Sequence, residues 1–154
     1  MNQAIDPGRA AAALMEALSS TFAELAFIDV EPAAQAAGST RIERPVRAAI
    51  DVLKPLSCRI ELECPASVKE RVEATIFAGA EAGGEGEDCL LEALNVAAGA
   101  FLTSYFGSGA DIKLELPHYL FFDDGSEGEV LAEVRGDAEG ETLRAALRSV
   151  RYRY

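Results

Sequence analysis

Four residues of the chain combine side-chain types and a spacing that could do chemistry. Asp88, Glu92, Asn95 and Gly99 follow one another at intervals of four, three and four residues. At about 100° of rotation per residue, this spacing places all four on one stripe of an α-helix. A carboxylate on such a stripe can pair with a cation, and a carboxamide can both accept and donate hydrogen bonds. The stripe is therefore a candidate site.

The same stripe has a simpler explanation. A polar edge is expected where an amphipathic helix meets solvent, and an acid near a helix start, such as Asp88, also suits the helix dipole. Spacing alone favours this solvent-facing edge. Against it, Asn95 is a mediocre helix former, and Gly99 weakens a helix by about 1 kcal/mol relative to Ala. Two such losses on one stripe suggest that something comes close to it.

The helix that carries the stripe is predicted to run from about Glu87 to Phe106 and to end at Gly107. Its charge-free run, residues 93–110, is long enough to span a membrane, but its polar residues and glycines favour a buried amphipathic helix instead. Apolar side chains within a wedge of about 100° should face the core. They are Leu91, Leu94, Ala98, Phe101, Leu102 and Tyr105.

The remaining elements follow from periodicity. Apolar residues at helical spacing predict a helix over residues 8–26. Alternation of period two predicts a central antiparallel hairpin, formed by Val46–Leu53 and Cys58–Cys64. Ser67 and Glu70 form a capping box that predicts the start of a short helix. Further extended segments are predicted at 27–31, 111–116, 118–122, 129–135 and 142–152, and the last of these could also be helical.

These helices and strands come in runs rather than in strict alternation. This order predicts a single α+β domain over residues 1–154, with helices packed on a largely antiparallel sheet. The net charge of −12 argues against a nucleic-acid surface, which needs a basic face. The start of the chain lacks the pattern of a secretory signal, and three cysteines without CxxC spacing fit reduced thiols. We therefore expect a cytoplasmic protein without a membrane partner.

Other motifs give little support for a second site. A single histidine, His118, excludes a metal site with two histidines, and no metal ligand set is predicted. The chain contains neither a GxSxG nucleophile motif nor a Walker A loop. Residues 123–127 favour a hairpin turn over a calcium loop, and residues 136–140 predict another turn. The arginines near the C-terminus are expected to be solvated or to protect a sheet edge.

The stripe nevertheless resembles a known motif. Asp88-x3-Glu92-x2-Asn95, followed by Gly99, is similar to the active helix of the CheC/CheX/FliY phosphatases, which dephosphorylate the chemotaxis response regulator CheY. The family motif is Ser or Asp, then Glu four residues on, then Asn three further. The order of elements and the opening segment FAELAFIDVEP also resemble CheX-like proteins. The helix over residues 9–26 has no matching Glu-x2-Asn, so one site is expected, as in CheX.

This resemblance implies a CheC/CheX-like fold and a phosphatase of two-component signalling. Its substrate would be the phosphoaspartate of a CheY-like receiver, which itself holds Mg²⁺, so no cofactor is expected in this chain. An acyl phosphate is reactive, and catalysis then needs little beyond a water placed in line. Asn95 would position that water, and Glu92 would pair with the receiver's active-site lysine. Asp88 and Gly99 would assist docking, although Gly99 could instead ease packing between elements.

Two other functions remain open. The chain could be a non-catalytic CheX-like module that binds receivers without hydrolysis. It could also be an unrelated scaffolding domain whose polar stripe is accidental. The resemblance to CheX, in which dimers occur, and the exposed sheet edges of a small domain together predict a homodimer.

Overall fold

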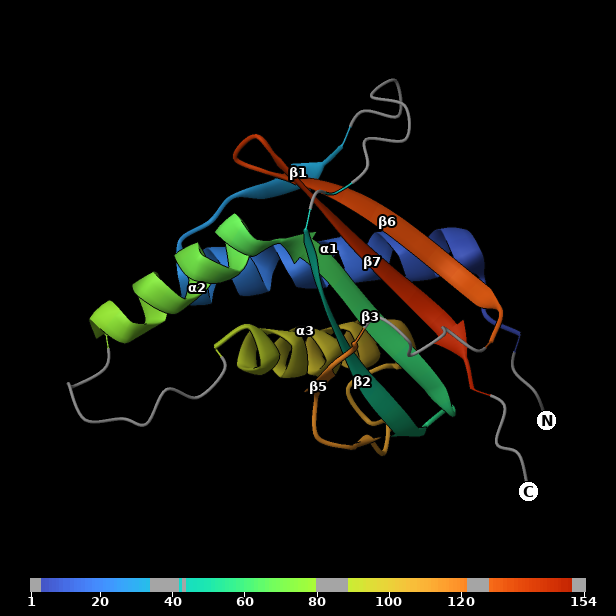
Figure 1. The fold of residues 1–154 in the computed structure, drawn as a ribbon. Coiled ribbons are helices and arrows are strands. Elements are labelled where there is room, and N and C mark those ends of the chain that lie inside the picture. The colour runs from blue at the N-terminus through green and yellow to red at the C-terminus, as the bar shows by residue number, and fades with distance from the viewer. Residues whose placement is uncertain (1–3, 34–41, 43, 80–88, 122–127, 151–154) are drawn as a thin grey trace.

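Three helices lie against one face of a seven-stranded antiparallel sheet (Figure 1). The computed structural model describes most of the chain: residues 4–33, 42, 44–79, 89–121 and 128–150, with only the backbone of residues 76–79. The predicted α+β class, with helices on an antiparallel sheet, is confirmed. The predicted turn at residues 123–127 and the predicted helix residues Glu87 and Asp88 lie outside the described residues.

The helices are α1 (Pro7–Ala26), α2 (Ala66–Gly79) and α3 (Cys89–Phe106). The strands are β1 (Val30–Pro32), β2 (Pro45–Lys54), β3 (Cys58–Pro65), β4 (Lys113–Leu114), β5 (His118–Tyr119), β6 (Val130–Ala138) and β7 (Glu141–Ser149). Their order across the sheet is β1-β6-β7-β3-β2-β4, and β5 also pairs with β2. The segment over residues 142–150, which the sequence left open, is therefore mainly a strand.

The first helix forms where its sequence predicts. Asp6 caps α1 by accepting hydrogen bonds from the backbone N–H groups of Gly8 and Arg9, at 3.0 and 3.2 Å from Oδ1. Pro7 occupies the first turn, where its missing N–H leaves no hydrogen bond unmade. The helix ends at Phe27, which adopts a left-handed conformation with φ of 53°. Leu14, Leu18 and Phe22, which belong to the apolar residues at helical spacing, are buried.

The predicted central hairpin is also confirmed. β2 pairs with β3 in a register that sets Val52 opposite Cys58 and Val46 opposite Cys64. β3 then pairs with β7, so it lies in the middle of the sheet. Every second residue of β3 enters the core beneath the helices, as period two requires. These residues are Cys58, Ile60, Leu62 and Cys64.

The short helix predicted near Ser67 is present as α2, but the capping box predicted at its start is not formed. The helix begins at Ala66, so Ser67 lies inside its first turn and does not cap it. The Ser67 hydroxyl donates instead to the Glu141 carboxylate on β7. Arg71 adds an ion pair to Glu139 in the β6–β7 turn. A side chain that could satisfy a local helix end is thus used for a contact between distant elements, which sequence spacing does not reveal.

The turn predicted at residues 136–140 is shorter than expected. β6 continues through Ala138, and only Glu139 and Gly140 turn the chain, with φ of 54° and 99°. This pair of positive φ values is typical of tight hairpins. Gly136 lies within the strand, where an added Cβ would come within 2.8 Å of Val30 Cγ1. The glycine therefore serves close packing of β6 against β1.

The arginines of β7 do not protect a sheet edge, because β7 lies between β6 and β3. Arg144 and Arg148 stand on the face away from the helices. Both nitrogens of the Arg144 fork donate to the Glu133 carboxylate at 2.9 Å. Arg148 Nε donates to Glu61 Oε2 at 2.9 Å. The predicted solvated charges are thus arranged as ion pairs across neighbouring strands.

Candidate functional site

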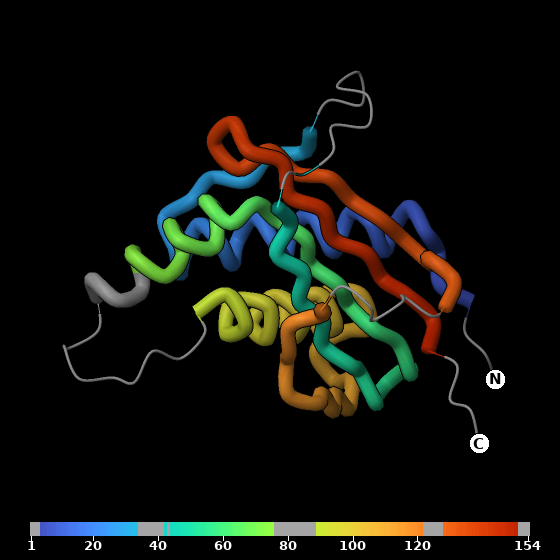
Figure 2. Tube along the Cα trace, viewed as in Figure 1, coloured from blue at the N-terminus to red at the C-terminus, as the bar shows by residue number. Residues whose placement is uncertain are grey.

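The candidate site lies on α3, which packs against α1 and also contacts α2 and β2 (Figure 2). The helix ends as predicted: Gly107 follows it with φ of 99°, and its N–H donates to the Thr103 carbonyl at 2.9 Å. A backbone conformation of this kind favours glycine and stops a helix.

The buried face of α3 is wider than the predicted wedge. Leu94, Ala98, Phe101 and Leu102 are buried as expected, whereas Leu91 and Tyr105 are only partly buried. Cys89, Leu90, Ala93 and Ala97 are buried as well. The facing helix α1 also buries small residues, namely Ala10, Ala13 and Ala17. Small side chains let helices pack closely, and hydrophobic spacing alone does not distinguish an alanine contact from an alanine on the surface.

The C-terminal end of α3 is fixed to the start of α1. Arg9 Nη2 donates to the Tyr105 carbonyl at 2.8 Å, and its guanidinium lies 4.2 Å from the centre of the Tyr105 ring. The Asp6 backbone N–H donates to the Tyr105 hydroxyl at 3.0 Å. The Tyr105 ring also stacks on Phe101. These contacts hold the helix that carries the stripe, and they could not be predicted from local sequence patterns.

The structure places Glu92, Asn95 and Gly99 together along the outer side of α3. Glu92 is exposed, and Asn95 and Gly99 are half-buried. Neither the Glu92 carboxylate nor the Asn95 carboxamide makes a hydrogen bond or ion pair with another described residue. Both groups are therefore available to a partner. Asp88, the first member of the predicted stripe, lies outside the described residues.

Gly99 has open space beside it. A Cβ added to this residue would meet no described atom within 4 Å. The proposal that glycine is needed here for packing between elements is therefore wrong. Because Gly99 has no side chain, it leaves a shallow depression on the helix surface next to Asn95. The exposed apolar residue Val96 flanks the same position with 38% of its surface accessible, and sequence reasoning missed it.

Glu92 is the only charged residue in α3. Among the described helices, α3 alone is long and apolar enough to cross a membrane by length and composition. Its inner face nevertheless packs on α1, α2 and β2. That arrangement is the one expected of a core helix, and it leaves Glu92 as the single charge that the described helix α3 presents on its outer side.

Other reactive groups lie away from this stripe. Cys58 and Cys64 are buried under the helices, and burial raises the pKa of each thiol to about 12. His118 lies on the short strand β5, as predicted. The described residues contain no group of three His, Cys, Asp or Glu side chains that could hold a metal ion.

The comparisons with known proteins identify the fold. No family model matches the chain, and no curated protein matches it in sequence. Solved structures do match. CheX from Vibrio vulnificus has a TM-score of 0.69 at 12% identity over 96% of this chain and 99% of that one. CheX from Desulfovibrio desulfuricans has a TM-score of 0.67 at 12% identity over 90% and 97%.

A third similar structure is a CheX–CheY–BeF3–Mg complex from Borrelia burgdorferi. It has a TM-score of 0.62 at 13% identity, over 94% of this chain and 97% of that one. Near-complete coverage in both directions means that the similarity extends over the whole fold. The chain therefore has the CheC/CheX/FliY fold that its motif resembles.

Proposed function

We propose that this protein is a phosphatase that hydrolyses the phosphoaspartate of a CheY-like receiver domain. The observation that carries the proposal is the position of Glu92 and Asn95, side by side on the outer surface of α3 and without partners among the described residues. They occur at the spacing of the CheC/CheX/FliY motif, in a chain with that fold.

Asn95 positions the attacking water in this proposal. Its carboxamide oxygen accepts a hydrogen bond from the water and sets it in line with the phosphorus atom. A neutral group suits this place, because a carboxylate would be repelled by the phosphoryl oxygens. Asn95 is half-buried, so one side of its carboxamide is shielded by the protein and the other is open to an approaching partner. The acyl phosphate is reactive enough that no stronger base is required.

Glu92 docks the partner. It lies nearly one helical turn before Asn95, is exposed, and is the only charge on α3. A charge-assisted bond to the receiver's active-site lysine would fix the register of the two proteins. Gly99 and Asp88 belong to the same docking surface, Gly99 by allowing close approach. The chain needs no cofactor of its own, since the receiver holds Mg²⁺ beside its phosphoaspartate.

The partner proposal has support in the B. burgdorferi structure, which contains a CheX together with a CheY. We further propose that the protein is cytoplasmic, because receivers are, and that it forms a homodimer. Light scattering at tens of micromolar that gives only the monomer mass would contradict the dimer and leave the site proposal intact.

Phosphate release tests the proposed function. Receivers from the same genome are phosphorylated, and the rate of phosphate release is measured with and without the protein. The proposal expects an acceleration that Asn95→Ala removes. If no receiver is hydrolysed faster, the phosphatase proposal is wrong. A pull-down with a receiver carrying a phosphoryl mimic then distinguishes a non-catalytic binding module from an unrelated scaffold.

A further inference from the structure

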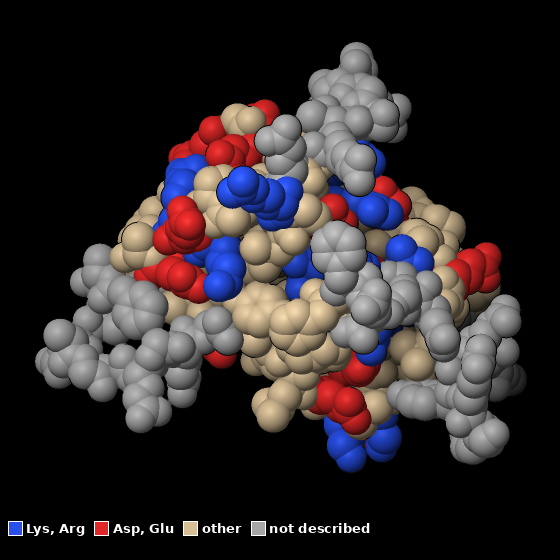
Figure 3. All heavy atoms as spheres, in the orientation of Figure 1, with Lys and Arg blue, Asp and Glu red and all other residues tan. Residues whose placement is uncertain are grey.

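The sheet face opposite the helices carries a small pocket centred on Glu61 of β3. Figure 3 looks onto this face and shows basic side chains lying among acidic ones over the strands. In the register of the sheet, Glu61 lies between Ala49 of β2 and Ala146 of β7. The small side chain of Ala146 leaves space beside Glu61 that a larger residue would fill.

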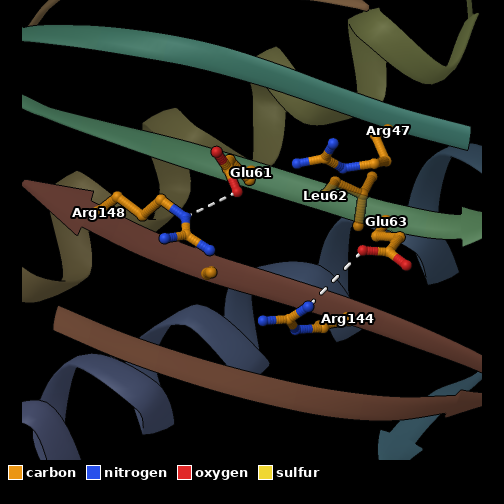
Figure 4. Close-up of a pocket in the computed structure, with 7 residues that line it drawn as sticks. Arg47, Glu61, Leu62, Glu63, Arg144 and Arg148 are labelled. Carbon is orange, nitrogen blue, oxygen red and sulfur yellow. Dashed lines mark hydrogen bonds and ion pairs between the residues drawn. The ribbon is translucent and has the colours of Figure 1, made fainter. Parts of the chain in front are cut away.

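This space is a pocket with a volume of about 30 Å³. Its polar lining consists of Arg47, Glu61, Glu63, Arg144 and Arg148, which stand on the same side of the sheet (Figure 4). The volume corresponds to roughly two water positions. One small group can therefore enter while its outer atoms remain in solvent.

Glu61 itself indicates what should bind. The residue has only 9% of its surface exposed. Its Oε2 atom accepts from Arg148 Nε, but its Oε1 atom is buried and has no hydrogen-bond partner among the described residues. A buried carboxylate oxygen without a donor is strongly disfavoured. The ligand should therefore bring a hydrogen-bond donor to Oε1.

The arginines indicate the charge of the ligand. Three arginines and two glutamates line the pocket, and Glu133, which lies outside the lining, pairs with Arg144 through two of its nitrogens. Arg144 Nη1 lies 3.7 Å from Glu63 Oε2, a distance too long for a hydrogen bond. Arg148 Nη1 donates a long hydrogen bond of 3.4 Å to the Gly128 carbonyl. Both guanidinium groups thus retain donors with weak partners, which an anion could accept from.

We propose that this pocket binds a small oxyanion that still carries a proton, such as hydrogen phosphate. Its P–OH group donates to Glu61 Oε1, and its unprotonated oxygens accept from Arg144 and Arg148. Sulfate has the same shape but carries no proton at neutral pH, so one of its oxygens would face Glu61 Oε1 without a hydrogen. The site should therefore prefer phosphate to sulfate. It lies across the sheet from α3 and does not depend on the proposed phosphatase activity.

Isothermal titration of the whole protein with sodium phosphate and with sodium sulfate, at neutral pH and equal ionic strength, tests this proposal. The parent protein should bind phosphate at least roughly tenfold more tightly than sulfate, because sulfate leaves the carboxylate oxygen unsatisfied. If the parent binds neither anion, or binds both equally well, the proposal is wrong.

Glu61→Gln tests the role of the orphan oxygen. Glutamine keeps an acceptor for Arg148 and offers an N–H group to the ligand, so sulfate should bind and the preference should fall to about one. Arg135→Gln is the matched control, because Arg135 lies on β6 outside the pocket and should leave the preference unchanged. A Glu61→Gln protein that folds and still prefers phosphate would overturn the assignment. Arg144→Gln, at a partly exposed position, provides a second variant and should weaken phosphate binding by roughly tenfold.

Discussion

Asn95 lies three residues after Glu92 on α3, and it is half-buried, whereas Glu92 is exposed. The two side chains therefore differ in exposure as well as in charge. A neutral, half-buried carboxamide suits the placement of a water molecule. An exposed carboxylate can adjust to a cation on an approaching protein. This difference separates the effects that substitutions at the two positions should have.

Asn95→Ala should lower the rate of receiver dephosphorylation by roughly 100-fold, since a misplaced water loses most of the advantage of orientation. Receiver binding should stay near that of the parent, because the lost group contacts the water. Rates of phosphate release and a separate binding titration measure the two effects. Activity equal to that of the parent, or loss through unfolding alone, would contradict the role of Asn95.

Glu92→Lys should weaken receiver binding, because it sets a positive charge against the receiver's lysine. The side chain is exposed, so the free energy of unfolding should change by no more than about 0.5 kcal/mol. A receiver titration and a urea denaturation curve test both statements. Glu16→Lys is a matched control: Glu16 is an exposed acid on α1, and its reversal changes net charge equally without touching the stripe.

Leu94→Asp should unfold the protein. Leu94 is 1% exposed and lies on the face of α3 that packs into the core. A buried, unpaired carboxylate there should cost several kcal/mol, a large part of the stability of a small domain. Circular dichroism should show loss of structure, whereas Leu94→Met should remain folded. A folded Leu94→Asp protein would mean that this face of α3 is not part of the core.

Gly136 and Gly99 should respond in opposite directions to the same substitution. Gly136→Ala places a Cβ within 2.8 Å of Val30 Cγ1 and 3.1 Å of Met15 Cε, which should destabilise the fold by about 1–3 kcal/mol. Gly99→Ala meets no described atom within 4 Å, and alanine should stabilise α3 by up to about 1 kcal/mol. Thermal denaturation of the two variants gives the comparison. Equal effects at both sites would contradict the packing described for β6.

The buried thiols predict how stability depends on alkaline pH. Burial raises the pKa of Cys58 and Cys64 from 9.0 to about 12, so the folded protein keeps two protons that the unfolded chain loses above pH 9. Stability should therefore fall as pH rises from about 9 toward 12, by up to about 1.4 kcal/mol per pH unit for each thiol. Denaturation curves across this range measure the slope. Replacing both cysteines with alanine should flatten it, and an unchanged slope would contradict this origin.

The sequence predicted the parts of this fold that depend on local periodicity. The hairpin of β2 and β3 followed from alternation, because one buried face fixes which residues point inward. The stripe of Glu92 and Asn95 followed from helical spacing. Contacts between distant segments could not be predicted in this way. The hydrogen bonds from Arg9 to the Tyr105 carbonyl and from Ser67 to the Glu141 carboxylate have no local sequence pattern, because each joins residues far apart in the chain.

The charged sheet face shows the same limit. The spacing of the arginines near the C-terminus predicted a solvated or edge-protecting face, and the sequence could not say which strands would flank it. Pairing with β3 and β6 brings Glu61 and Glu133 to Arg148 and Arg144. The pocket at Glu61 depends on this pairing, which brings Ala146, Arg144 and Arg148 of β7 beside β3. It was therefore absent from the prediction.

The pairing of β3 with β7 also has a consequence for folding kinetics. The two hairpins, β2–β3 and β6–β7, each join neighbouring segments, whereas β3 and β7 are separated by the chain that contains α2 and α3. Closing this long loop costs entropy before any contact across it is gained. We expect the hairpins to form early and their union to limit the rate. The pocket at Glu61, whose lining comes from β2, β3 and β7, would then be assembled only in that late step, so a nascent chain could not bind an anion there before β7 had emerged from the ribosome.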